Sequence, residues 1–248
     1  MQLEALIFDV DGTLSETEEA HRAAFNEAFA EAGLGWSWDQ ALYRELLKVT
    51  GGKERIRHFM NRAAPDDLTR PDADAWIAGL HKRKTAIYTA MVDDGAVALR
   101  PGVAPLLEAA RRDGVRLAIA TTTSLPNVES LLAATLGGGW ADVFEVIAAG
   151  DQVSRKKPAP DVFELALKRL ALPASRCLAL EDSANRVASA AGAGLATLVT
   201  LSAYTTGDRF DGAVAIVEDL AALAGPARGT AQEGARILAA IRDLAGRD

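Results

Sequence analysis

The chain has 248 residues, of which 49% are hydrophobic and 25% are charged, and its net charge is −7 at pH 7. This size and composition suit a globular protein with one large domain or two modest ones. The negative charge argues against nucleic acid or a membrane surface as a partner, because both repel an acidic protein. The single cysteine, Cys177, excludes an internal disulfide framework and lies in an apolar run that predicts a packed position.

The N-terminal residues indicate where the protein is located. MQLEALIFDVDG carries acid where a secretory signal would carry base, and no apolar run is long enough to span a bilayer. A single cysteine also fits a reducing compartment. We therefore expect a cytoplasmic protein, and we expect it to be a monomer.

Short apolar runs alternate with helical patterns, which predicts an α/β fold with a Rossmann-like parallel sheet. The runs are continuously apolar, as in strands that are covered on both faces. They comprise residues 4–10, 116–122, 144–150, 177–182 and 196–201, with a weaker candidate at 212–219.

One long interval interrupts this spacing. About 90 residues separate Asp11 from the helical segment that begins at Pro101, whereas a crossover needs only about a dozen. The interval is helical in pattern, and residues 15–33 place four apolar residues on one face, namely Phe25, Ala28, Phe29 and Ala32. We predict an α-helical cap at residues 16–95 over the end of the first strand, inserted into a core of residues 1–15 and 96–248. Its HKRK run is predicted to be a solvated helix face, and the four tryptophans are predicted to pack.

Polar side chains follow four of the predicted strands, at the edge where open parallel sheets bind ligands. Asp9 and Asp11 repel one another, so folding alone gives no reason for the pair, although a solvated strand end with a turn is the alternative. The other strand ends favour a shared site. The set comprises Asp9 and Asp11, then Thr121, Thr122 and Thr123, then Lys156 and Lys157 in a loop, then Glu181 and Asp182.

These residue types suit phosphoryl transfer through an aspartyl-phosphate. A carboxylate can attack phosphorus only if the charge of the phosphate is neutralised. A metal held by Asp9 and Asp182, with Lys157 and a threonine hydroxyl on the other oxygens, would neutralise it. All-oxygen ligands favour Mg²⁺. Asp11 would then protonate the leaving oxygen and later take a proton from water.

DVDGT, the strand-end threonine, the lysine before Pro158 and LEDS resemble, in this order, the four motifs of the haloacid dehalogenase superfamily of phosphohydrolases. The helical insert resembles that superfamily's small α-helical cap. The resemblance implies that Asp9 is the nucleophile, Asp11 the general acid/base and Thr121 a donor to a phosphoryl oxygen. It also implies that Lys157 is the neutralising cation. Lys156 would serve equally on charge, but the position before proline favours Lys157.

The same resemblance implies a magnesium site. The ion would bind the side chains of Asp9 and Asp182 and the main-chain carbonyl of Asp11, and Glu181 would reach it directly or through water. The sequence departs from the family at Arg186, because EDSANR has arginine where the family pattern EDSxxG has glycine. This arginine would alter local packing or add a cation near the phosphate.

Within the superfamily, the chain is similar to the CbbY-type sugar-bisphosphate phosphatases and their relative beta-phosphoglucomutase. The similar segments are ETEEAHRAAFNEAF, WSWDQALYRELLKVTGGKERI and ATTTSLPNVESLL. The CbbY likeness implies a phosphorylated sugar such as xylulose 1,5-bisphosphate as substrate, whereas a sugar-phosphate mutase is the alternative enzyme. A non-enzymatic phospho-acceptor module resembling a receiver is less compatible, because receivers are shorter and have no helical insert.

TGGKERIR in the cap suits a second phosphate. Two glycines before a helix free backbone amides and expose the positive helix end. We therefore predict that Gly52, Lys53 and Arg55 bind phosphate, and Arg55 can do so with two hydrogen bonds. The alternative is an ordinary helix N-terminus with solvated basic residues.

Other candidate substrate contacts each have a structural alternative. The resemblance places Glu18 on substrate hydroxyls, although Ser15-x-x-Glu18 also matches a capping box. His21 shares the helical face of Glu18 and lines the cleft or lies on the surface. Tyr43 would hydrogen-bond the sugar or pack half-buried. The remaining candidates are Thr122 and Asn127, and Asn127 would alternatively help to begin a helix.

Overall fold

The computed structural model describes residues 3–246, so the ends of the predicted core at residues 1, 2, 247 and 248 lie outside the described residues. The chain forms two compact units. The core comprises Met1–Glu16 and Ala98–Asp248, and the cap comprises Thr17–Val97. The boundaries predicted after residues 15 and 95 lie slightly earlier in the chain than these.

The core is built on a six-stranded sheet with the order β3-β2-β1-β4-β5-β6. Every strand pair is parallel, which confirms the predicted α/β class. Each predicted strand is present but shorter than its apolar run. The strands are β1 (Ala5–Phe8), β2 (Arg116–Ala120), β3 (Val146–Ala148), β4 (Cys177–Glu181), β5 (Ala196–Thr200) and β6 (Ala215–Val217). The weak signal of β6 reflects its position at the sheet edge, where Ile216 is 51% exposed.

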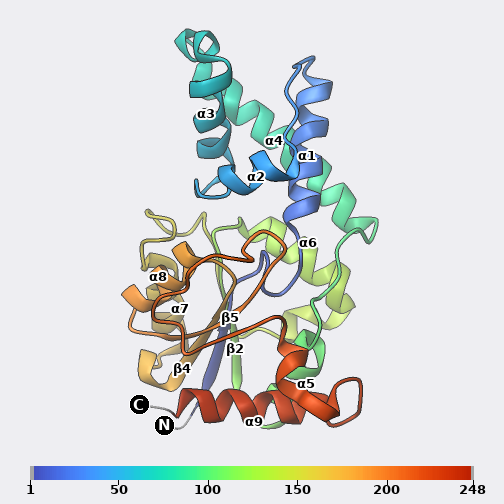
Figure 1. Cartoon of the computed structure of the whole chain (residues 1–248), viewed down its shortest axis with the longest axis vertical. Coiled ribbons are helices and arrows are strands. Elements are labelled where there is room, and N and C mark those ends of the chain that lie inside the picture. The colour runs from blue at the N-terminus through green and yellow to red at the C-terminus, as the bar shows by residue number, and fades with distance from the viewer. Residues whose placement is uncertain (1–2, 247–248) are drawn as a thin grey trace. The chain divides into compact units, whose positions relative to one another are not determined.

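Helices cover both faces of the sheet (Figure 1). Helices α5 (Val103–Arg112) and α6 (Leu125–Leu136) lie on one side, and α7 (Asp161–Leu170) and α8 (Ala184–Gly192) lie on the other. The closing helix α9 (Glu233–Ala245) packs against α5.

The strand order reverses at β1. The chain moves from β1 to β2 and β3 in one direction, and β4 then pairs with the free side of β1. Phe8 at the end of β1 is in register with Ile119 of β2 and Leu180 of β4. The residues that follow these three strands therefore reach the same edge, at the switch point where such sheets bind ligands.

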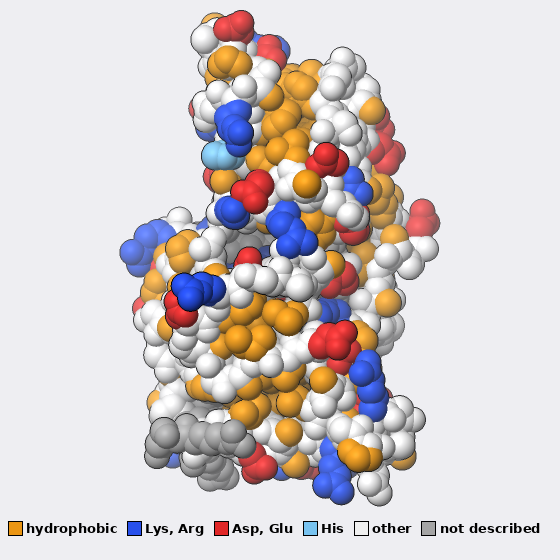
Figure 2. All heavy atoms as spheres, viewed as in Figure 1, with side chains coloured by type: hydrophobic (Ala, Val, Ile, Leu, Met, Phe, Trp, Pro, Cys, Tyr) orange, Lys and Arg blue, Asp and Glu red, His pale blue; other side chains and the backbone are white. Residues whose placement is uncertain are grey.

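The cap consists of α1 (Glu18–Glu31), α2 (Gln40–Leu46), α3 (Gly52–Ala63) and α4 (Ala73–Asp93), with a 3₁₀ turn at Pro65–Thr69. Its interior is aromatic, and hydrophobic side chains are visible between α1 and α3 in Figure 2. Trp38 is fully buried, with ring centroids 4.7 Å from Phe25 and 4.9 Å from Phe29. Trp36 and Trp76 also pack against aromatic rings, which confirms their predicted packing role.

Two expectations for the cap are wrong. Ala32 does not share the buried face of α1, because the helix ends at Glu31 and Ala32 is exposed. The HKRK run is not wholly solvated, because Lys84 is only 5% exposed. Four consecutive residues cover a full helical turn of about 3.6 residues, so one of them faces the interior. The Nζ atom of Lys84 lies 2.7 Å from Nδ1 of His21.

None of the helices within residues 3–246 combines the length and the apolar character needed to cross a membrane.

Candidate active site

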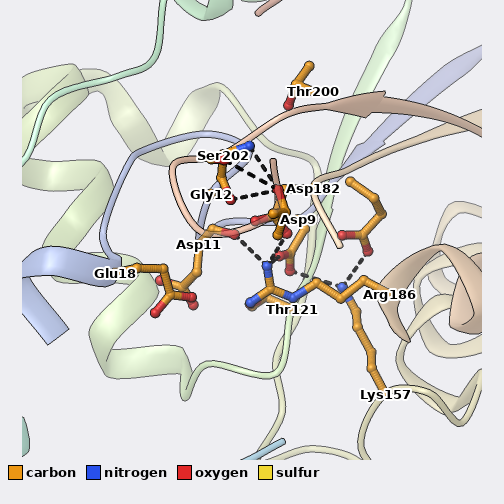
Figure 3. Close-up of polar contacts among 12 residues, drawn as sticks. Asp9, Asp11, Gly12, Glu18, Thr121, Lys157, Asp182, Arg186, Thr200 and Ser202 are labelled. Carbon is orange, nitrogen blue, oxygen red and sulfur yellow. Dashed lines mark hydrogen bonds and ion pairs between the residues drawn. The ribbon is translucent and has the colours of Figure 1, made fainter. Parts of the chain in front are cut away.

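Three carboxylates gather where β1 and β4 end (Figure 3). Asp9 follows β1, Glu181 ends β4 and Asp182 comes next. One oxygen of each lies within 4.8 Å of the others, and all three side chains are buried. We call these three residues the acidic cluster. Burial of so many carboxylates together is unfavourable unless cations accompany them.

Lys157 is the first such cation. It is 1% exposed, and its Nζ donates to Asp9 Oδ1 at 2.9 Å and to Glu181 Oε1 at 2.7 Å. A third hydrogen bond goes to the carbonyl of Ala120 at 2.8 Å, where β2 ends. The neighbouring Lys156 is half-buried. Of the two lysines, the structure brings Lys157 to the acidic cluster.

Arg186, in the first turn of α8, is the second cation (Figure 3). Its Nη1 donates to the main-chain carbonyl of Asp11 at 2.7 Å and lies 3.2 Å from Asp9 Oδ2. The same nitrogen pairs with Asp182 Oδ1. The sequence predicted that this arginine would alter local packing or add a cation near the phosphate, and the structure places its guanidinium among the acids.

Burial sets the protonation behaviour of the cluster. Burial raises the pKa of Glu181 to about 8, the charge of Asp9 acts in the same direction, and Lys157 and Arg186 oppose both. Burial also raises the pKa of Asp182, against the opposing charge of Arg186. Glu181 Oε2 accepts no hydrogen bond from the described part of the chain. The acidic cluster therefore keeps one buried carboxylate oxygen without a donor among the described residues.

The residues after β2 organise Asp11. Thr123 Oγ1 donates to Asp11 Oδ2, and the backbone N–H of Thr123 donates to Thr121 Oγ1 at 3.2 Å. Thr121 is fully buried at the strand end. Sequence reasoning placed Thr123 at this edge but gave it no role, because the partner carboxylate is 112 positions away.

Two further residues shape the site. Ser202, just after β5, hydrogen-bonds Asp182 (Figure 3). Sequence reasoning missed it, although a hydroxyl after the fifth strand is the same signal that marked the threonines. Gly12 has a φ of +77°, and a Cβ there would lie 2.1 Å from Asp182 Oδ2. The glycine is required both for this backbone conformation and for the close approach of Asp182.

Three predicted substrate residues meet inside the cap. The hydroxyl of Tyr43 donates to Glu18 Oε2 at 3.3 Å, and Arg55 Nη1 donates to the Tyr43 hydroxyl at 3.2 Å. Tyr43 is fully buried rather than half-buried. The N-cap of α1 is Thr17, with no side-chain capping bond, so the capping-box alternative for Ser15 and Glu18 is wrong.

The other candidates lie at separate positions. Gly52 begins α3 after Gly51, Lys53 is exposed in the same first turn, and His21 stacks on Tyr88. Arg55 also donates to the carbonyls of α2 and the turn after it, so it holds the cap together as well. In the core, Thr122 and Asn127 are partly buried, and Asn127 lies in the first turn of α6 after the N-cap Ser124.

The family model of the haloacid dehalogenase-like hydrolases matches residues 3–194 of the chain. This stretch contains the acidic cluster, Asp11, the threonines after β2 and Lys157. The chain belongs to the haloacid dehalogenase-like hydrolases. It is accordingly a phosphatase of that family.

Two relatives and one crystal structure show which members of the family the chain is similar to. The CbbY protein of Rhodobacter capsulatus is 53% identical over 224 residues, which cover 90% of this chain and 96% of that protein. The CbbY protein of Cereibacter sphaeroides is 50% identical over 223 residues, covering 90% and 95%. A crystal structure of a CbbY mutant from Rhodobacter sphaeroides in complex with xylulose 1,5-bisphosphate is 49% identical. It covers 92% of this chain and 100% of that one, with a TM-score of 0.84.

Proposed function

We propose that this phosphatase hydrolyses xylulose 1,5-bisphosphate to xylulose 5-phosphate, with Mg²⁺ and through an aspartyl-phosphate on Asp9. The observation that carries the proposal is the identity of about half of all residues, along nearly the whole chain, to a protein that binds this bisphosphate. The buried acidic cluster with Lys157 supports the chemistry.

The donor set fits a magnesium ion. The acidic cluster offers only oxygen ligands, within 4.8 Å of one another, and Glu181 Oε2 has no hydrogen-bond donor among the described residues. Hard oxygen donors of this kind suit Mg²⁺. Asp9, Asp182 and the Asp11 carbonyl would hold the ion, with Glu181 beside them. A bound ion would supply positive charge for the phosphoryl oxygens.

The chain's own groups account for the two proposed steps. In the first, a carboxylate oxygen of Asp9 attacks phosphorus, the ester P–O bond breaks, and Asp11 gives its proton to the leaving sugar oxygen. In the second, water attacks the phosphorus of the acyl phosphate, Asp11 takes the proton, and inorganic phosphate leaves with Asp9 regenerated. Lys157 fixes the Asp9 carboxylate through Oδ1.

Threonines and backbone would orient the reacting groups. Thr123 holds the carboxyl of Asp11 from β2's loop. We propose that the Thr121 hydroxyl donates to a phosphoryl oxygen, because it is buried at the strand end beside the acids. The N–H of Thr123 donates to Thr121 Oγ1, which would orient the Thr121 hydroxyl before substrate binds.

Cap residues would select a sugar with a second phosphate. We propose that the hydrogen-bonded trio Glu18, Tyr43 and Arg55 binds substrate hydroxyls and the distal phosphate. Lys53 lies nearby in the sequence at the first turn of α3, where helix amides also favour an anion. The remaining proposed substrate contacts are His21, Gly52, Thr122 and Asn127.

A panel of sugar phosphates tests the substrate. Phosphate release should require Mg²⁺ and should be fastest, by kcat/KM, for xylulose 1,5-bisphosphate over ribulose 1,5-bisphosphate, beta-glucose 1-phosphate and phosphoglycolate. One phosphate should be released per sugar. Slow and equal release from all four, with isomerisation of glucose 1-phosphate instead, would identify a mutase and overturn the proposal.

A further inference from the structure

Arg186 contacts three of the four groups proposed to bind magnesium directly or through water, namely Asp9, Asp182 and the Asp11 carbonyl. Its Nη1 faces Asp9 Oδ2 at 3.2 Å, the Asp11 carbonyl at 2.7 Å and Asp182 Oδ1. Lys157 shares only Asp9 with this set and binds its other oxygen, Oδ1, and its remaining hydrogen bonds go to Glu181 and a β2 carbonyl. One of the site's two cations therefore lies at the metal ligands, and the other lies beside them.

A magnesium ion held by these three oxygens would take the position of Arg186 Nη1, because this one nitrogen contacts all of them. Magnesium binds its oxygen ligands at short distances, so an ion on the same three oxygens would leave no room for the guanidinium nitrogen among them. The guanidinium keeps its positive charge at all working pH values and would repel the ion. The Arg186 side chain is 16% exposed, so it lies between the buried acids and solvent.

We propose that Arg186 is an internal competitor of the divalent cation. Binding of magnesium then requires the guanidinium to leave Asp9, Asp182 and the Asp11 carbonyl, and the affinity for the ion is reduced by the strength of those contacts. The inference rests on the magnesium site proposed above. It differs from a packing role for Arg186, because a packing residue would not oppose metal binding.

Direct measurement of metal affinity tests whether Arg186 competes with the divalent cation. Mg²⁺ is titrated by calorimetry and Mn²⁺ by electron paramagnetic resonance into chelator-treated wild type, Arg186→Gln and Arg186→Gly. Both variants should bind about tenfold more tightly, the order expected when charge-assisted contacts no longer compete. Arg186→Lys keeps a charge but has a single nitrogen head, so its affinity should fall between those of wild type and Arg186→Gln.

Arg116→Gln is the matched control. Arg116 also pairs with a carboxylate, that of Glu145, but it begins β2 at the opposite end of the strand from the acidic cluster. Its loss should leave both metal affinities unchanged.

The unfolding temperature, measured with chelator and with Mg²⁺, gives a second readout. With chelator present, Arg186→Gln should unfold at a lower temperature than wild type, because two buried acids lose their counterion. With saturating Mg²⁺ the upward shift of the unfolding temperature should be larger in the variant, because binding is tighter. A purely structural arginine would lower the unfolding temperature equally in both buffers.

The outcomes separate the two proposals. Metal binding by wild type and Arg186→Gln with equal affinity, or weaker binding by the variant, would overturn the competition and leave the magnesium site intact. Absence of binding in wild type and in all three Arg186 variants would overturn the magnesium site itself. Circular dichroism checks folding, and if Arg186→Gln does not fold, the predicted tighter binding of Arg186→Lys carries the test.

Discussion

The most demanding prediction concerns Lys157→Met, which removes a buried charge and keeps most of the side-chain length. Lys157 is 1% exposed and donates to Asp9, Glu181 and the Ala120 carbonyl at 2.7–2.9 Å. Removing one partner of a buried ion pair costs about 3–5 kcal/mol, because the other charge remains without compensation. The lower end is expected, because the pKa of Glu181 is already raised to about 8 and its carboxyl can take a proton.

The loss is measurable as a change in the unfolding temperature of the core. For chains of about 150–250 residues, 1 kcal/mol corresponds to about 2–4 °C, so a loss of about 3 kcal/mol should lower the midpoint by about 6–12 °C. Differential scanning calorimetry measures this midpoint. Lys156→Met is the matched control, because it removes the same charge one position away at a half-buried site, and it should cost less than about 1 kcal/mol.

A double variant shows whether the pairing itself causes the loss. Lys157→Met with Glu181→Gln should lose less stability than the sum of the two single variants, because the second change removes one of the carboxylates left unpaired. Strict additivity, or a midpoint for Lys157→Met that matches the Lys156→Met control, would refute the reasoning.

Two further predictions concern residues outside the acidic cluster. Burial raises the pKa of Cys177 from 9.0 to about 11, so the native thiol should react slowly with a disulfide reagent at pH 8 and rapidly once unfolded. Between pH 9 and about 11 the folded protein keeps the thiol proton that the unfolded chain releases. The free energy of unfolding, measured in urea titrations, should therefore decline over this pH range. A native thiol that reacts as fast as the unfolded one would contradict the burial of Cys177. Trp38→Ala should cost about 3–5 kcal/mol in the cap. Trp140→Ala, at a half-buried position of the core, should cost less. Equal losses in calorimetry would contradict the main contribution of the aromatic rings around Trp38 to the stability of the cap.

The sequence predicted strands well because a doubly covered strand needs a continuous apolar run. The predicted strands are longer than the observed ones, because the residues that follow a strand come directly after its apolar residues in the sequence. Asp9 and Thr121 lie just past strand ends that the hydrogen-bonded ladder sets at Phe8 and Ala120. Strand β6 gave a weak signal because an edge strand is only partly buried.

The errors concern long-range partners. Lys84 looked like part of a solvated HKRK face, but it contacts His21, which is 63 positions away, and lies 4.8 Å from the ring centres of Phe25 and Tyr88. Arg186 was visible as an unusual residue, yet the position of its guanidinium depends on the register of β1 beside β4. Neither partner follows from local spacing.

The most direct test of the central claim is to turn over xylulose 1,5-bisphosphate with Mg²⁺, quench in acid and identify the phosphorylated peptide by mass spectrometry. The proposed function predicts phosphate on the peptide that contains Asp9, one phosphate released per sugar with xylulose 5-phosphate as product, and neither label nor release with Asp9→Asn. Undiminished phosphate release by Asp9→Asn, or turnover with no label on that peptide, would contradict it.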